Sequence, residues 1–163
     1  MTTQLVLQRY QPCYQAGVKA LILPIQNHEF GIEISAEQQP DLSDIENFYQ
    51  QGTGDFWLAL AGEQVVGCIG LKDIGERQGA LRKMFVAKAW RGREHGAASS
   101  LLQILVAHAR EQQLQAIWLG TTAKFLAAHR FYEKNGFSEV AEKNLPAAFP
   151  VMKVDTKFYH LAL

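Results

Sequence analysis

The stretch from residue 81 to residue 110 places the tightest constraint on how this 163-residue chain can fold. It starts as an apolar segment typical of a strand, passes through a short basic loop, and continues as a helical pattern that opens with glycine and alanine. The first amides of such a helix have no partner within it and lie at the positive end of its dipole. Because small residues let an anion approach those amides, the segment predicts a phosphate-binding turn.

Two arginines and a run of small residues mark this predicted turn. Arg91 and Arg93 precede it and add positive charge suited to a phosphate. Glu94 is expected to point into solvent, since a carboxylate beside a phosphate is repulsive, and His95 either touches a phosphate or lies near the helix start. The pattern places three small residues at the anion, Gly96, Ala97 and Ala98. These three would also serve to pack a helix start against a sheet, but Arg93 and the preceding strand favour the phosphate site.

Two segments resemble a known family. Residues 93–98, R-E-H-G-A-A, are similar to R/Q-x-x-G-x-G/A, the acetyl-CoA pyrophosphate loop of the GNAT superfamily of N-acetyltransferases. Residues 127–137, A-A-H-R-F-Y-E-K-N-G-F, resemble the closing helix and strand of that superfamily. The loop is two residues longer than the common form, and Phe125 stands where the family usually carries asparagine. The resemblance covers residues 55–140 well and the N-terminal third in outline.

The resemblance implies a fold, a cofactor and site residues. It implies one N-acetyltransferase domain over residues 1–163, of the α/β class, with a mixed, mostly antiparallel sheet of about six to seven strands, a βαβ unit and helices on both faces. It implies acetyl-CoA as cofactor, with the pantetheine arm docked like an added strand on main-chain groups of Met84, Phe85 and Val86. Tyr132 is implied to be catalytic near the cofactor sulfur, where its hydroxyl either donates a proton or hydrogen-bonds to the departing thiolate.

The implied activity is transfer of an acetyl group to a primary amine by direct attack in a ternary complex. Cys13 and Cys68 stand in no nucleophile motif, which argues against a covalent acyl-enzyme. The alternative is a non-catalytic module of the same fold that senses acyl-CoA or binds a partner. The sequence does not identify the base that deprotonates the amine, and the candidates by chain position are His28, Glu29, Glu33, Asp73, Glu76 and His108.

Charge is distributed unevenly although the formal net charge is zero. Residues 1–71 hold two basic and eight acidic residues, a net −6, while residues 72–163 hold 14 basic and eight acidic residues, a net +6. The basic part suits a polyanionic cofactor, and the acidic part either attracts a cationic amine or forms solvated surfaces. The acceptor is expected to be a small-molecule or peptide amine. A net charge of zero argues against a nucleic-acid partner.

Other signals concern location and assembly. The N-terminus lacks the basic start and apolar run of a signal peptide, and no apolar stretch approaches membrane-spanning length. The two cysteines form neither a disulfide framework nor a metal-ligand spacing. We therefore expect a cytoplasmic protein with no membrane partner and no metal. The oligomeric state is left open, with a homodimer among the options.

The hydrophobic pattern predicts the order of the elements. Helices are expected over residues 12–23 (ended by Pro24), 41–49, and 123–135 (with Gly136 as a left-handed cap). The helix after the basic loop should bury a stripe formed by Ala98, Leu101, Leu102, Leu105 and Ala109. Strands are expected over residues 4–10, 56–61, 65–71, 80–86, 116–120 and 154–163, with another that starts at Phe137. The strand at 116–120 should lie parallel to the strand at 80–86, in which Arg82 and Lys83 should point to opposite faces.

Overall fold

The computed structural model describes residues 4–92 and 95–163, so Arg93 and Glu94 of the predicted phosphate turn lie outside the described residues. Within that part of the chain, seven strands form one sheet in the order β1-β2-β3-β4-β5-β7-β6. Their bounds are β1 (Leu5–Arg9), β2 (Asp55–Ala61), β3 (Gln64–Asp73), β4 (Gln78–Val86), β5 (Ala116–Thr121), β6 (Ser138–Val140) and β7 (Lys157–Ala162). The predicted α/β class and mixed, mostly antiparallel sheet are confirmed, and β4 and β5 form the expected parallel pair.

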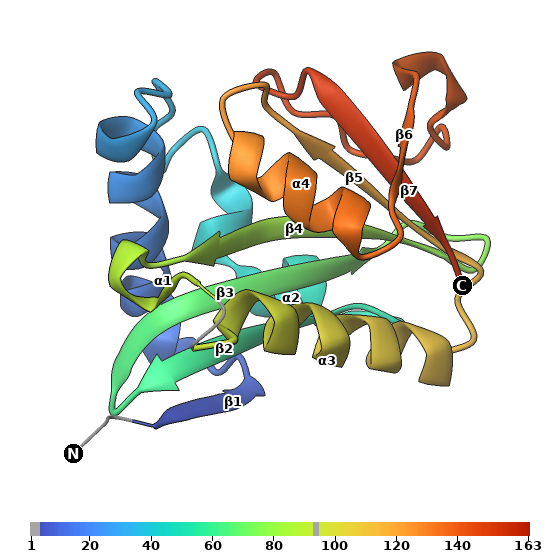
Figure 1. Ribbon diagram of the computed structural model, residues 1–163. Coiled ribbons are helices and arrows are strands. Elements are labelled where there is room, and N and C mark those ends of the chain that lie inside the picture. The colour runs from blue at the N-terminus through green and yellow to red at the C-terminus, as the bar shows by residue number, and fades with distance from the viewer. Residues whose placement is uncertain (1–3, 93–94) are drawn as a thin grey trace.

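Helices cover both faces of the sheet. They are α1 (Gln15–Pro24), α2 (Ile45–Tyr49), α3 (Ala97–Glu111) and α4 (Leu126–Lys134). Figure 1 shows α3 and α4 in front of the sheet and α1 and α2 behind it. In the described part of the chain, no helix is long and apolar enough to cross a membrane.

The alternation of side chains along β2 divides the interior into two cores. Trp57 and Ala59 face the core that the apolar stripe of α3 completes. Phe56, Leu58 and Leu60 face the opposite core, formed with α1 and α2. Because a strand with apolar residues on both faces must be covered on both sides, this continuous run dictates a layered fold.

The predicted stripe of α3 is confirmed except at its first position. Leu101, Leu102, Leu105 and Ala109 are buried, and the buried residue of the first turn is Ala97. Ala98, which the 3.6-residue period also allowed on that stripe, is half-buried and lines a cavity instead.

The helix at the N-terminal third runs further than the sequence predicted. Pro24 was expected to end it, yet Pro24 keeps helical dihedral angles and the chain passes directly into a π-helical turn, η2 (Ile25–Glu29). Proline removes one N–H donor and crowds the preceding turn, and the wider turn that follows lets the helix continue. This extension carries Ile25 and Gln26 to the wall of the cavity described below.

Other boundaries differ by a few residues. The helix predicted over residues 123–135 begins at Leu126, because residues 122–125 form a turn closed by a hydrogen bond from Phe125 N to Thr122 O. The helix predicted over residues 41–49 is split into a 3₁₀ turn, η3 (Pro40–Ser43), and α2. Gly136 has a φ of +94°, as expected of a left-handed cap.

The sheet opens at its centre. β4 and β5 pair through residues 78–80 and 116–118, and the two strands then diverge (Figure 1). On its other edge β4 carries a bulge, because Arg82 pairs with Gly70 and Phe85 with Cys68, which leaves Lys83 and Met84 opposite Ile69. Lys83 takes a φ of +55°, in the left-handed region. The bulge bends β4 away from β5 and so creates the opening.

A substitution at Leu105 tests how much the packing of α3 against the sheet contributes to stability. Its side chain is fully buried in the core on the α3 face. Leu105→Ala should lower the free energy of unfolding by about 2–5 kcal/mol, because the cavity left behind collapses only in part. Urea unfolding followed by circular dichroism measures this loss.

The matched control is Leu126→Ala, since Leu126 is 61% exposed. It should change the stability by less than about 0.5 kcal/mol. Equal losses for the two variants would contradict the packing described for α3.

Candidate functional site

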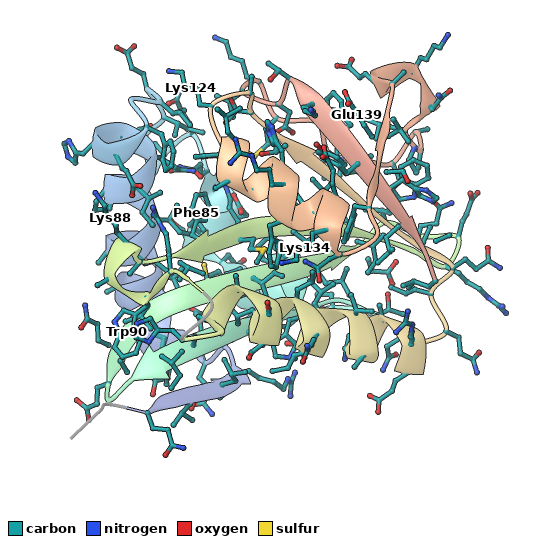
Figure 2. All side chains as sticks on the ribbon, in the orientation of Figure 1. Phe85, Lys88, Trp90, Lys124, Lys134 and Glu139 are labelled. Carbon is teal, nitrogen blue, oxygen red and sulfur yellow. The ribbon has the colours of Figure 1, made fainter. Side chains whose placement is uncertain are left out.

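The opening between β4 and β5 is a cavity of about 350 Å³. Its walls are residues 81–86 of β4, residues 120–122 at the end of β5, the first turns of α4, the η2 turn, and Met152, Val154 and Asp155. Figure 2 shows Phe85 between α1 and the N-terminal end of α4, with Lys88 and Trp90 on the turn η4 (Lys88–Trp90) that follows β4. The cavity therefore connects the α3–α4 side of the sheet with the α1–α2 side.

The structure brings several of the predicted cofactor residues to this cavity. Those that line it are Met84, Phe85, Val86, Arg91 and Ala98. Ala97 is buried in the core beneath α3, and the His95 ring lies against Trp90 with 4.9 Å between centroids. Arg93 and Glu94 lie outside the described residues. The cofactor role of the whole set stays a prediction.

The start of α3 has the geometry of an anion site. Gly96 is the N-cap residue with a φ of +64°, and its carbonyl accepts the hydrogen bond from Ser100 N at 2.9 Å. No described side chain caps this helix, and the amides of its first turn are the groups that an anion at this end would meet. At Gly96 a side chain would be strained by the left-handed backbone, which explains the glycine.

Arg91 links the loop after β4 to the η2 turn through hydrogen bonds. Its Nε donates to the Val86 carbonyl at 2.8 Å, and its two terminal nitrogens pair with the Glu29 carboxylate, Nη2 to Oε1 at 2.8 Å. The hydrogen bond from Arg91 holds the pKa of the Glu29 carboxyl below its usual value. Much of the Arg91 charge is thereby engaged within the protein.

Tyr132 lies on α4 with its hydroxyl directed at β4. The residue is 5% exposed, and its hydroxyl donates to Met84 Sδ at 3.8 Å, a long contact to a weak acceptor. Its ring packs against Phe137 and Tyr159. Burial raises the pKa of Tyr132, so the phenol stays protonated at neutral pH and acts as a hydrogen-bond donor.

Arg82 and Lys83 lie on the same face of the sheet, and the prediction of opposite faces is wrong. Arg82 Nη2 is 3.5 Å and Lys83 Nζ 3.9 Å from the sulfur of Met152. The bulge explains this, because a left-handed residue inserted into a strand breaks the alternation of side chains. Both cations line the cavity on its α2 side.

A buried polar cluster supports these two cations. Arg82 Nε donates to Tyr49 Oη at 3.2 Å, and that hydroxyl donates to Asp41 Oδ2 at 2.7 Å. Lys83 Nζ lies 3.8 Å from the same carboxylate oxygen and donates to Gln39 Oε1. Burial lowers the pKa of Lys83 to about 8.

Asp155 faces the cavity from the segment between β6 and β7. Its Oδ2 accepts a hydrogen bond from Met152 N at 2.9 Å and lies beside Gly120, where a Cβ atom would stand 2.7 Å from it. Burial raises the pKa of the Asp155 carboxyl. Sequence reasoning missed this residue because it belongs to no motif, and it missed the bulge at Lys83 because strand periodicity alone predicts regular alternation.

None of the six candidate bases lines the cavity. Glu29 is paired with Arg91, and Asp73 accepts hydrogen bonds from the amides of Thr53 and Gly75. His108 Nε2 lies 2.9 Å from the Thr53 carbonyl oxygen, on the far part of α3. The others, His28, Glu33 and Glu76, are exposed. Among the described residues, no group of three or more His, Cys, Asp or Glu side chains could hold a metal ion.

Comparison with known protein families gives a match over the region that contains most of these site residues. A family model described as the Acetyltransferase (GNAT) family matches residues 19–137. This range includes β4, the start of α3 and Tyr132, and it excludes Asp155. An N-acetylaspartate synthetase from Danio rerio is 38% identical over 104 residues, which is 63% of this chain and 36% of that protein. The chain spans about a third to a half of the length of the curated relatives it matches.

Solved structures extend the similarity over nearly the whole chain. A GNAT-family acetyltransferase from Staphylococcus aureus Mu50 is 38% identical, with a TM-score of 0.93 over 97% of this chain and 98% of that one. An acetyltransferase from Streptococcus agalactiae 2603 is 30% identical, with a TM-score of 0.94 over 99% and 100% of the two chains. A PaiA N-acetyltransferase from Thermoplasma acidophilum in complex with coenzyme A, 13% identical with a TM-score of 0.74 over 100% of each chain, shares the fold.

The lowered pKa of Lys83 predicts a pH-dependent stability. Between about pH 8 and the ordinary lysine value of 10.5, the unfolded chain binds this proton more tightly than the folded chain, so the Lys83 contribution to stability rises with pH. Lys83→Met removes this contribution. The difference in free energy of unfolding, wild type minus variant, should therefore increase by roughly 2 kcal/mol between pH 7 and pH 10.

Urea unfolding at the two pH values measures this difference, and Lys143→Met, at an exposed position, is the control. A wild-type-minus-variant difference that stays constant with pH would show that Lys83 is charged at both.

Proposed function

The chain belongs to the GNAT acetyltransferase family, and on that premise we propose that it is an N-acetyltransferase that uses acetyl-CoA to acetylate a primary amine. The amine would attack directly in a ternary complex. The observation that carries this proposal is the cavity between β4 and β5, which brings Tyr132 and the open edge of β4 together. Neither described cysteine fits a covalent route, because Cys68 is buried and Cys13 lies in the η1 turn (Pro12–Tyr14), away from the cavity.

The residues present fit an acyl-CoA cofactor. In the described sheet, no strand pairs with the β5-facing edge of β4 beyond Ala80, so main-chain groups of Met84, Phe85 and Val86 are placed for a pantetheine arm. For the pyrophosphate we assign the helix start at Gly96, Ala97 and Ala98, where the Gly96 amide already donates to the Gly92 carbonyl at 3.3 Å. Arg91, Arg93, Glu94 and His95 complete the proposed loop. Related folds solved with coenzyme A support this assignment, and the acetyl group is the finer part of the proposal.

When bound, acetyl-CoA supplies a thioester whose sulfur leaves with an electron pair. We assign to Tyr132, whose hydroxyl contacts Met84 on β4, a hydrogen bond to that sulfur as negative charge develops there. Burial makes its phenol a weaker acid, so transfer of its proton to the sulfur is uphill. We therefore favour stabilisation of the thiolate by Tyr132 over proton donation.

The acceptor is proposed to be a small amine. The curated relatives include enzymes named for acetylated aspartate, which supports a small-molecule acceptor. A cationic acceptor, which the acidic residues 1–71 suggested, finds little support in the cavity, whose charged lining residues are Arg82, Lys83, Arg91 and Asp155. A cytoplasmic location and a homodimer stay proposals that rest on the sequence.

Tyr132→Phe tests the proposed role of the phenol. Loss of the hydroxyl should lower kcat about tenfold to a hundredfold, because one hydrogen bond to the developing charge is removed. The KM for acetyl-CoA should change by less than about threefold, since the ring still packs between Phe137 and Tyr159. Release of coenzyme A thiol, followed with a chromogenic disulfide, measures both constants.

Tyr14→Phe, a tyrosine that does not line the cavity, is the matched control. Full activity of Tyr132→Phe would remove Tyr132 from the mechanism. Binding of acetyl-CoA by the wild type without thiol release on any amine would favour the non-catalytic sensor.

Arg93→Glu tests the phosphate loop. Reversing this charge next to the α3 start should weaken coenzyme A binding by tenfold or more, measured by titration calorimetry at fixed salt. Arg77→Glu, in the turn before β4, reverses a distant charge of the same kind and should leave the affinity unchanged. Equal affinities for wild type and Arg93→Glu would place the phosphates elsewhere.

A further inference from the structure

We propose that the α2 side of the cavity is an acceptor subsite for a small amine that also carries a carboxylate, such as an α-amino acid. Arg82 and Lys83 hold the carboxylate, and Asp155 holds the amino group. This inference rests on the proposed acetyltransferase function and names the class of acceptor.

The first observation is the incomplete coordination of Lys83. Its side chain is 3% exposed, and an ammonium group has three N–H donors. Among the described residues, Gln39 Oε1 is the one oxygen at hydrogen-bond distance, while Asp41 Oδ2 stands at 3.8 Å and Met152 Sδ at 3.9 Å. A buried ammonium with one close oxygen partner gains much from a further anionic acceptor.

The second observation is that the guanidinium of Arg82, the residue next to Lys83, also has a nitrogen without a strong hydrogen-bond acceptor. Two of its nitrogens are satisfied, Nε by Tyr49 Oη and Nη1 by the Pro150 carbonyl at 3.1 Å. The third, Nη2, meets the Met152 sulfur, which is a weak acceptor. The Met152 sulfur thus lies between the two cations. A carboxylate that took the place of this sulfur would make charge-assisted hydrogen bonds to both cations.

The third observation is the carboxylate on the opposite wall. Asp155 lines the same cavity, and one of its oxygens is used by the amide of Met152 at 2.9 Å. Asp155 lies where the segment before β7 meets the end of β5, and it lines the same cavity as Tyr132 and Met84. An ammonium group would find its counter-charge here.

The size of the acceptor follows from Met152. The backbone nitrogen of this residue touches Asp155, and its sulfur touches both cations. Four covalent bonds separate these two atoms, so the cations and the carboxylate lie about one amino-acid side chain apart. An amine and a carboxylate joined by a few carbon atoms match that separation, and a long polyamine has no carboxylate for Arg82 and Lys83.

The reaction balances with these groups. Asp155 takes one proton from the ammonium form of the acceptor, which frees the nitrogen lone pair. That lone pair forms the C–N bond to the acetyl carbonyl carbon, the C–S bond breaks, and its electron pair stays on sulfur. The second nitrogen proton ends on the thiolate, which Tyr132 stabilises by its hydrogen bond, and Asp155 returns its proton to solvent.

The acceptor class is tested on the wild-type protein with matched amines. Thiol release from acetyl-CoA is measured with L-aspartate, L-alanine, L-alaninamide and spermidine. The amino acids should exceed L-alaninamide and spermidine in kcat/KM by at least about tenfold, because a site built for a buried carboxylate rejects ligands that lack it. Preference for spermidine or for the amide would overturn this inference and leave the acetyltransferase function standing. Absence of thiol release with every amine would contradict the proposed acetyltransferase function itself.

Substitutions then test the residues. Lys83→Met should raise the KM for the better amino acid by tenfold or more and reduce the preference over L-alaninamide, while the affinity for acetyl-CoA stays within about twofold. Arg82→Gln should act in the same direction. Asp155→Asn should lower kcat and remove the acidic limb of the pH profile. Lys143→Met, at an exposed lysine, is the control.

A variant that failed to fold would be recognised by its circular dichroism, and the amine comparison on the wild type would still decide the acceptor class. An unchanged KM in a folded Lys83→Met variant would contradict the carboxylate role of Lys83.

Discussion

The parting of β4 from β5 is the constraint on which the rest of the structure depends. In an unbroken sheet the edge of β4 would be used by β5 along its whole length, and the two faces would be sealed from each other. Pairing stops after Ala80, and the bulge at Lys83 turns the remainder of β4 away. The result is a passage between the two cores, lined by β4 residues on the α3–α4 side and by two largely buried cations on the α2 side.

The bulge costs free energy that neighbouring groups offset. A left-handed conformation at a residue with a side chain costs on the order of 1–2 kcal/mol. Cys68, opposite Phe85 on β3, donates its thiol to the Lys83 carbonyl at 3.1 Å. Burial raises the pKa of this thiol to about 12, so it stays a donor throughout the neutral range. Cys68 is therefore better explained as a support for the bulge than as a nucleophile.

Sequence patterns predicted the structural features that follow from short segments of the chain. They did not predict the features that depend on contacts between distant segments. The β2–β3 hairpin, the parallel β4–β5 pair and the Gly136 cap follow from periodicity and backbone preference, and all three are present. The bulge at Lys83 and the placement of Asp155 depend on packing between segments far apart in the chain. The acidic character of residues 1–71 shows the same limit, because Glu29 and Asp41 pair with Arg91 and Lys83. Part of the charge asymmetry between residues 1–71 and residues 72–163 is therefore used in ion pairs within the protein.

A polar chain through the η2 turn links the two sides of the passage. Arg91 binds Val86 on β4 and Glu29 in η2. In the same turn, Gln26 exchanges hydrogen bonds with Gln39 at 2.9 and 3.0 Å, and Gln39 Oε1 accepts a hydrogen bond from Lys83 Nζ. The η2 turn thus contacts both Arg91 and the glutamine whose oxygen accepts from Lys83. The proposed cofactor loop and the proposed acceptor cations share one scaffold, which would suit a reaction in which both substrates must be held at once.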